Sequence, residues 1–192
     1  MNAIVIGGSP GCGKTTVASL LGRSLDRDVI SLGELAVEKD CITEEDLERD
    51  TLVIDEDCMV KAIRDEIHKN DDEIILEGHY VDLVPFRDVE KVIILRVHPE
   101  ALRTRLMERD YPEIKVRENV EAEVFGVCQM DAIHSFGEEL VFEVDTTGLT
   151  PEETRDKIID LLRGSSEPAR IDWMQRLEKE GILDDYVTPQ FE

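Results

Sequence analysis

Short apolar runs alternate along this chain with longer segments whose apolar residues recur at helical spacing. The runs that predict buried strands are residues 3–7, 29–32, 73–77, 91–97 and 140–145. The segments that predict helices are residues 14–25, 34–39, 57–69, 99–109, 116–136 and 151–162. Strands that alternate with helices are typical of a parallel sheet covered by helices on both faces. The pattern therefore predicts an α/β fold.

Two segments show neither pattern. Residues 41–50 are polar and are predicted to be irregular, and residues 164–169 contain GSSEP, which is typical of a flexible linker. One more helical stretch follows around residues 173–180. Asp55 and Asp57 stand at the start of the third predicted helix, where either could cap it or bind a metal ion. We favour Asp57 as a helix cap.

Composition narrows the class of protein. The 192 residues suit one compact domain, and 41% hydrophobic residues are enough for a buried core. No stretch approaches the roughly 18 apolar residues of a membrane helix, and the first residues do not resemble a signal peptide, so no membrane association is expected. The four cysteines (Cys12, Cys41, Cys58 and Cys128) form no C-x-x-C pair. We therefore expect reduced thiols, no structural zinc and a cytoplasmic location.

Acidity is the unusual feature of the composition. Asp and Glu number 45 against 22 Lys and Arg, which gives a formal net charge of -23. Such a charge repels phosphates, so direct binding to free DNA is not expected. It would attract a basic partner. Adaptation to a salty cytoplasm explains the same composition, and the sequence leaves both readings open.

The clearest chemical motif is GSPGCGKT at residues 8–15, which matches G-x-x-x-x-G-K-[ST] at every fixed position. It lies between a predicted strand and a predicted helix, as a phosphate-binding loop requires, so an incidental glycine-rich turn is disfavoured. Lys14 can reach the β- and γ-phosphates of ATP, Thr15 can bind Mg²⁺, and Thr16 can contact the α-phosphate. The residues expected to bind ATP here are Gly8, Gly11, Cys12, Gly13, Lys14, Thr15 and Thr16.

Four motifs in this order resemble the adenylate kinase isoenzyme 6 family. They are GSPGCGKTT at residues 8–16, SLGELA at 31–36, VIDED at 53–57, and ILEGHYVD at 75–82 followed by RLMERDY at 105–111. The loop alone is shared by many proteins, whereas the order and spacing of all four are much more specific. The resemblance covers roughly residues 1–163, which would form the kinase domain. Residues 164–192 would be a linker and a tail of unknown role.

The resemblance implies a P-loop fold like that of nucleoside monophosphate kinases. It implies a monophosphate-binding segment near residues 31–54 and a small lid near residues 105–116. It also implies Mg²⁺-dependent transfer of a phosphoryl group from ATP to AMP or a similar nucleoside monophosphate, with additional ATPase activity. The family is linked to maturation of the small ribosomal subunit, and a basic small-subunit ribosomal protein would suit the acidic chain.

Three further residues are candidates for catalysis. Glu77 ends a predicted strand, where a carboxylate could hold a Mg²⁺-bound water or orient an attacking group. The resemblance ties His79 to catalysis and lid motion, although a histidine after a strand can equally be a structural hydrogen-bonding residue. The match to R-L-x-x-R-x-Y favours Arg109 as a nucleotide contact from the lid, with local ion pairing as the alternative.

The monophosphate segment departs from the adenylate kinase pattern. Val37 stands where these kinases usually carry an arginine that grips the monophosphate, and Arg87 or Arg49 could replace it. Gly33 would let the backbone approach the monophosphate. Arg96, at the end of a strand, is expected to pair within the fold. Two alternative functions therefore stand beside the adenylate kinase reading: an ATP-switched ribosome-assembly factor with little kinase activity, and a kinase for a small metabolite.

Overall fold

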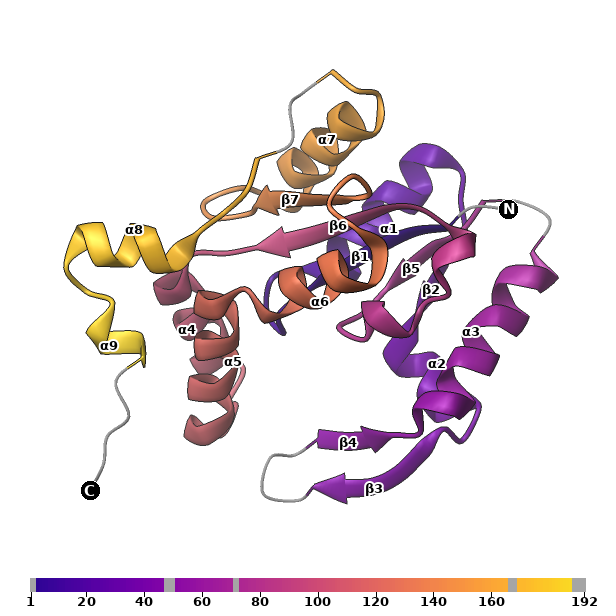
Figure 1. The fold of residues 1–192 in the computed structure, drawn as a ribbon, viewed down its shortest axis with the longest axis horizontal. Helices are drawn as coiled ribbons and strands as arrows, with labels where there is room; N and C mark the ends of the chain where they lie inside the picture. Colours follow the sequence, from indigo (N-terminus) through magenta and orange to yellow (C-terminus); the bar gives the residue numbers. More distant parts are fainter. Residues whose placement is uncertain (1–2, 47–50, 71–72, 166–168, 188–192) are drawn as a thin grey trace.

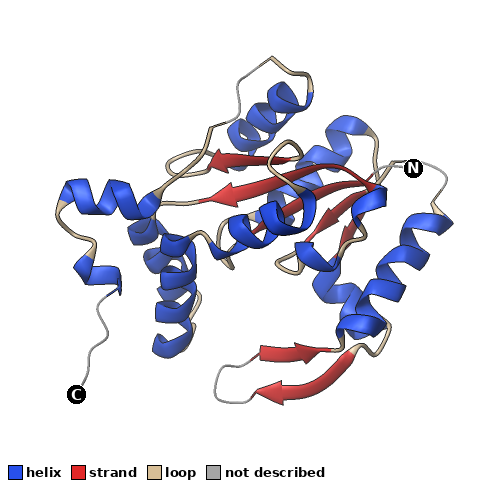
Figure 2. Ribbon diagram, in the orientation of Figure 1, coloured by secondary structure: helices blue, strands red, loops and turns tan. Residues whose placement is uncertain are grey.

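Five parallel strands form the central sheet, in the order β2-β5-β1-β6-β7 (Figures 1 and 2). The computed structural model describes residues 3–46, 51–70, 73–165 and 169–187. The strands are β1 (Ala3–Gly8), β2 (Val29–Ser31), β5 (Ile75–Glu77), β6 (Val89–Arg96) and β7 (Val141–Asp145). β1 and β5 are buried along their whole length, as strands covered on both faces of a parallel sheet are, whereas Val29 at the start of β2 is exposed. All five predicted strands are therefore present.

Helices cover both faces of the sheet, as the sequence pattern predicted. Apolar residues of α2 (Leu32–Glu38), α3 (Glu56–Lys69) and α6 (Val127–Phe136) pack on one face. Those of α1 (Lys14–Leu25), α4 (Pro99–Met107), α5 (Glu113–Phe125) and α7 (Pro151–Leu162) pack on the other. The predicted α/β architecture is confirmed.

The strand register places the carboxyl ends of several strands at one edge of the sheet. Gly8 of β1 pairs with Leu95 of β6, and Ser31 of β2 pairs with Glu77 of β5. The segments that follow β1, β2 and β5 therefore emerge side by side. In parallel α/β sheets, ligands bind outside this edge.

A short antiparallel hairpin replaces the irregular segment predicted for residues 41–50. It consists of β3 (Ile42–Asp46) and β4 (Thr51–Ile54) and projects away from the sheet (Figure 1). Leu52 and Val53 are exposed there. Because the hairpin buries little apolar surface, its strands lack the hydrophobic pattern from which sequence analysis recognises a strand.

The long helix predicted for residues 116–136 is instead two helices, which meet at Gly126. Gly126 has a φ of 67° and caps α5, and its carbonyl accepts a hydrogen bond from the N–H of Met130 in α6. Glycine adopts this left-handed conformation at little cost. The apolar periodicity continues through the break, so periodicity alone did not reveal it.

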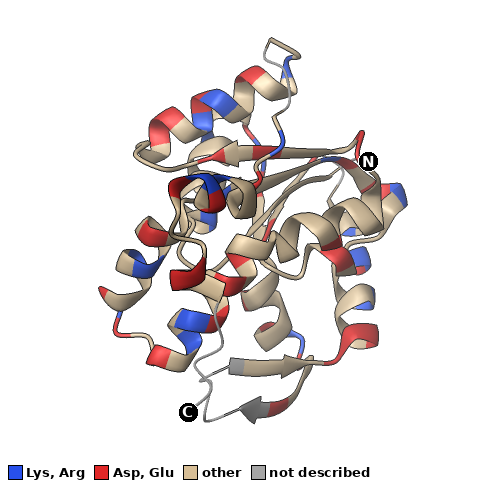
Figure 3. Ribbon diagram, turned by 60° about the vertical axis from the view of Figure 1, so that its left-hand side comes forward, with Lys and Arg blue, Asp and Glu red and all other residues tan. Residues whose placement is uncertain are grey.

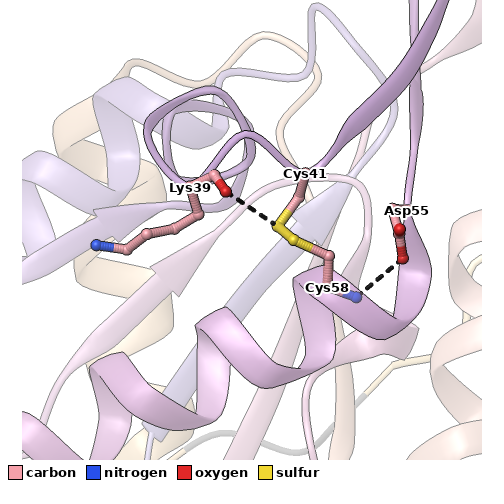
Figure 4. Close-up of a disulfide and its surroundings, with 4 residues drawn as sticks. All are labelled: Lys39, Cys41, Asp55 and Cys58. Atoms are coloured by element: carbon pink, nitrogen blue, oxygen red, sulfur yellow. Dashed lines mark hydrogen bonds between the residues drawn. A yellow bond between two sulfur atoms is a disulfide. The ribbon is translucent and has the colours of Figure 1, made fainter.

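Cys41 and Cys58 form a disulfide, which contradicts the prediction that all thiols are reduced (Figure 4). The fold brings the end of α2 against the first turn of α3 and leaves the two Cα atoms 5.4 Å apart, a separation that a disulfide spans. Asp55 caps α3 by accepting a hydrogen bond from the N–H of Cys58 at 2.9 Å. The preference for Asp57 as the cap was therefore wrong.

The last described residues pack back onto the domain. Ala169 forms an antiparallel bridge with Glu143 of β7, and α8 (Trp173–Glu180) lies against α5 (Figure 1). The short helix α9 (Asp184–Val187) also contacts α5. Trp173 and Leu177 of α8 are fully buried. Among the described helices, none is both long and apolar enough to cross a membrane.

Candidate active site

The phosphate loop joins β1 to α1 at the carboxyl edge of the sheet. Gly8 has a φ of 136°, and a Cβ atom on it would lie 2.4 Å from the carbonyl oxygen of Leu95. Gly13, with a φ of 98°, caps the start of α1. Both positions therefore require glycine. The resulting turn leads into the amino terminus of α1, a position that favours bound anions.

Lys14 is held inside this loop by the loop itself. Its Nζ atom donates hydrogen bonds to the carbonyl oxygens of Gly8 at 2.8 Å and Ser9 at 3.1 Å, and lies 4.0 Å from the Sγ of Cys12. The Lys14 side chain is buried, as is Cys12. Burial raises the pKa of the Cys12 thiol, although Lys14 acts in the opposite direction. An ammonium group is thereby fixed where phosphate charge would lie.

Thr15 and Glu77, the two residues predicted to bind metal, meet at this edge. The Thr15 hydroxyl donates to the Oε1 atom of Glu77 at 3.3 Å, and Glu77 is only 4% exposed. A hydroxyl and a carboxylate are oxygen ligands of the kind that suit Mg²⁺. No group of three or more His, Cys, Asp or Glu that could hold a metal ion occurs in the part of the chain that the structure describes.

His79 lies just beyond Glu77 and is exposed, with its ring 4.1 Å from that of Tyr80. Desolvation by the surrounding protein lowers the pKa of His79 to about 4, and the positive charges of Lys14 and Lys115 act in the same direction. A neutral imidazole at this position can donate one hydrogen bond and accept another, but it carries no charge near pH 7.

The predicted lid lies at the junction of α4 and α5, where the structure distinguishes its arginines. Arg105 Nη1 donates to the carbonyl oxygen of Gly11 at 3.4 Å, so Arg105 already touches the loop. Arg109 lies beyond the end of α4, and its side chain is exposed. The lid motif predicts Arg109 as the nucleotide contact, whereas the arginine that contacts the phosphate loop in the structure is Arg105.

The predicted monophosphate residues are not all brought together. Gly33 is exposed in α2, two residues after Ser31, which pairs with Glu77. Val37 is 59% exposed in the same helix. Arg87 lies in a short 3-10 helix (Phe86–Asp88) that leads into β6. Because the first residue of β6 pairs with the first residue of β1, Arg87 lies at the opposite edge of the sheet. Arg49 falls outside the described residues.

The sequence pattern did not predict one buried contact of the phosphate loop, which joins Ser9 to Glu123. Ser9 donates a hydrogen bond to the Oε2 atom of Glu123 in α5 at 2.6 Å, and both residues are buried. Glu123 follows Val120 by three positions and therefore lies on the buried face of its helix. An acidic residue on an apolar helix face was the signal that could have identified it.

The phosphate loop, the enclosed lysine and the Thr15–Glu77 pair together define a P-loop ATP-dependent phosphotransferase. Solved structures of similar fold include shikimate kinase from Acinetobacter baumannii in complex with shikimate, with a TM-score of 0.60, 17% identity, and coverage of 86% of this chain and 95% of that one. Deoxyadenosine kinase from M. mycoides with bound dATP has a TM-score of 0.53, 15% identity, and coverage of 84% and 99%. These identities establish the fold alone.

The sequence comparisons are more specific. The model of the AAA domain family matches residues 4–126. A protein named "Putative adenylate kinase" from Methanothermobacter thermautotrophicus is 44% identical over 84% of this chain and 90% of its own. A protein of the same name from Thermococcus onnurineus is 36% identical over 92% and 93%. The chain belongs to the family of these proteins, within the AAA domain family, and its membership supports a nucleotide kinase function.

Proposed function

We propose that this protein is an adenylate kinase that transfers the γ-phosphoryl group of ATP to AMP and forms two molecules of ADP. One observation carries the proposal: Lys14 and the Thr15–Glu77 pair lie together at the loop edge, in a chain that is 44% identical over 84% of its length to a protein named "Putative adenylate kinase". We place the reaction in the cytoplasm, where both nucleotides are available.

The proposed roles follow from the chemistry of phosphoryl transfer, which needs positioning and positive charge more than covalent participation. An oxygen of the AMP phosphate attacks the γ-phosphorus, and the bond to the β–γ bridging oxygen breaks with its electron pair leaving on ADP. Lys14 would stabilise charge on the transferring group. Arg105 and Arg109 would approach it from the lid. His79, neutral near pH 7, would orient groups by hydrogen bonding.

Thr15 and Glu77 would hold Mg²⁺, which supplies positive charge beside the β- and γ-phosphates when it is bound. Glu77 would act through its buried carboxylate, either on the ion or on a water bound to it. The substrate monophosphate would lie over the segment that begins at Ser31, with Gly33 allowing a close approach of the backbone.

The experiment that tests this proposal measures ADP formation from Mg-ATP with and without AMP. We expect AMP to raise ADP production far above the basal rate of hydrolysis. Slow hydrolysis that AMP does not stimulate would contradict the adenylate kinase assignment. Turnover with shikimate or another small metabolite, together with none with AMP, would instead identify a metabolite kinase.

A second function has its own supporting observation. Val37 is 59% exposed where the resemblance places a phosphate-gripping arginine, so this helix position offers no cation to AMP. Weak AMP binding would leave an ATPase that switches the protein between two states. With a net charge of -23, such a switch would suit a basic ribosomal protein of the small subunit, as in the adenylate kinase isoenzyme 6 family.

Purified small-subunit proteins test this second function. The immobilised protein would be incubated with them in Mg-ATP and in Mg-ADP, at a salt concentration high enough to remove weak charge-driven binding. We expect one basic protein to be retained in one nucleotide state and released in the other. Equal retention in both states, or none, would contradict the switch.

A further inference from the structure

A buried network joins the phosphate loop to the C-terminal segment, which we define as residues 169–180. The residue at the centre of this network is Glu123 of α5, which is 2% exposed. The Oε2 atom of Glu123 accepts the hydrogen bond from Ser9 of the loop. The Oε1 atom accepts three more, from Arg96 Nε at 2.8 Å, Trp173 Nε1 at 3.0 Å and the Val97 N–H at 3.2 Å. One carboxylate therefore links loop, sheet and C-terminal segment.

Arg96 anchors the same carboxylate from the end of β6. It is 1% exposed, and its Nη2 atom donates to the backbone carbonyl of Glu123 while Nη1 donates to Glu143 at 2.7 Å. Nη1 also lies 3.2 Å from the carbonyl oxygen of Ile171 in the C-terminal segment. The expectation that Arg96 pairs within the fold is thus confirmed, and one of its hydrogen bonds reaches the C-terminal segment.

The C-terminal segment is held firmly against this network. Ile171 N–H donates to Glu143 at 3.3 Å, and Arg170 donates to the Val141 carbonyl at 2.9 Å. Trp173 is 1% exposed and packs edge-on against His98, with ring centroids 5.3 Å apart. The segment therefore supplies the indole donor that orients Glu123, and its other contacts keep that donor in place.

We infer that Glu123 is a positioning residue for the phosphate loop and that the C-terminal segment holds it in position, so that docking of this segment and binding of ATP stabilise each other. The inference rests on the proposed ATP-binding role of the loop. Ser9 is the second residue of the motif, and its carbonyl oxygen also accepts a hydrogen bond from Lys14. Release of Trp173 would loosen the hold of Glu123 on Ser9, and the loop would lose order that it needs for phosphates. Such coupling between sites is reciprocal by thermodynamic necessity.

Trp173 is the only tryptophan in the chain, so its fluorescence reports on the C-terminal segment without any label. The first experiment titrates the wild-type protein with Mg-ATP and records tryptophan emission. We expect a saturable change in emission at the ATP concentrations at which calorimetry detects binding. ATP binding with no change in emission would overturn the coupling, and this test needs no variant.

The second experiment measures ATP affinity by calorimetry in Trp173→Phe, Ser9→Ala and the double variant. Trp173→Phe keeps an aromatic ring at this position, though a smaller one, and removes the N–H donor to Glu123. We expect it to weaken ATP binding about 5-fold, the lower end of typical coupling. Ser9→Ala should weaken binding by a similar factor. Because both act through Glu123, the double variant should lose much less than the roughly 25-fold product of the single effects.

Met174→Leu is the matched control, because Met174 neighbours Trp173 in α8 but is 41% exposed. It should bind ATP as the wild type does. A merely structural role for Trp173 would lower the melting temperature of Trp173→Phe and leave its ATP affinity unchanged, which would overturn the inference. A protein that binds ATP with this coupling but does not phosphorylate AMP would contradict only the proposed function.

Discussion

At the scale of single residues, Lys14 concentrates the chemistry of the site. Its ammonium group is buried and bonded to two carbonyl oxygens of its own loop, so its position is defined by the backbone. A charge held in this way needs little reorganisation to stabilise a transferring phosphoryl group. The Lys14 side chain would therefore contribute to phosphoryl transfer through its charge and its fixed position, and not through its length alone.

We therefore expect Lys14→Met to reduce the rate of phosphoryl transfer by about 100-fold or more, as removal of a preorganised electrostatic partner typically does. ADP formation from Mg-ATP and AMP measures the effect. Lys157→Met is the matched control, because Lys157 is an exposed lysine of α7 outside the phosphate loop. Normal turnover in Lys14→Met would contradict the role assigned to the loop.

His79 makes a pH prediction. Its pKa is lowered from the ordinary value of 6.5 to about 4 in the folded protein. Between these two values the unfolded chain binds a proton that the folded protein does not, so folding stability falls as the pH drops from about 6.5 toward 4. NMR titration of the imidazole should show it neutral down to pH 5. His79→Gln should lose part of the acid sensitivity, and an imidazole that titrates near 6.5 would contradict the prediction.

At the scale of elements, the disulfide closes the base of the β3–β4 hairpin. Cys41 directly precedes β3, and Cys58 lies in the first turn of α3, so the bond closes the loop that carries both hairpin strands (Figure 4). Cys41 is fully buried in the core cluster that α2 and α3 form with the sheet. Leu52 and Val53 of the hairpin are exposed, so we expect this cross-link to contribute to the stability of the segment that carries the hairpin.

The linked cysteines are separated by 17 positions in the sequence, and loop-closure entropy for a loop of this length predicts that loss of the disulfide lowers the free energy of unfolding by about 3 kcal/mol. Guanidinium denaturation of Cys41→Ala/Cys58→Ala, compared with the wild type, measures it. Cys128→Ala is the control for loss of a thiol that forms no disulfide. If dithiothreitol shifts the wild type and the double alanine variant equally, the bond does not contribute as stated.

At the scale of the whole molecule, acidic residues dominate the surface. Asp and Glu outnumber Lys and Arg by 45 to 22, and Figure 3 shows the acidic positions spread over many helices. Like charges at this density repel one another in the folded state. The described ion pairs within the core, such as that of Arg96 with Glu123, are shielded from salt by burial, whereas the surface charges are not.

We expect KCl to raise the melting temperature, because salt shortens the Debye length from about 10 Å at 0.1 M to about 3 Å at 1 M. Each kcal/mol gained corresponds to roughly 2–4 °C for a chain of this size. Differential scanning calorimetry across KCl concentrations measures the shift. Screening predicts that most of the gain occurs below 1 M, and a melting temperature that is flat or falls with salt would contradict it.

The local pattern of the chain was sufficient for the sheet, the helices on both faces and the phosphate loop. Each of these features is indicated by residues that are close together in the sequence. The indicators are apolar periodicity, a strand that ends in glycines, and a lysine at the start of a helix. Glu77 was also predictable, because parallel strands present their carboxyl ends at one edge. The structure places Glu77 within hydrogen-bonding distance of Thr15, while the metal-binding role of both residues stays a prediction.

Only the tertiary structure decided which distant segments meet. Hydrophobic periodicity does not encode how helices dock. It therefore did not predict the Cys41–Cys58 disulfide, the break between two helices at Gly126, or the contact of Arg105 with the phosphate loop. The link from Ser9 through Glu123 to Trp173 spans 164 positions of sequence, and the hydrogen bonds that define it form only when β6, α5 and α8 are packed together. Packing decides which group a buried polar residue contacts. The spacing of that residue from its apolar neighbours in the sequence already indicates that it is buried.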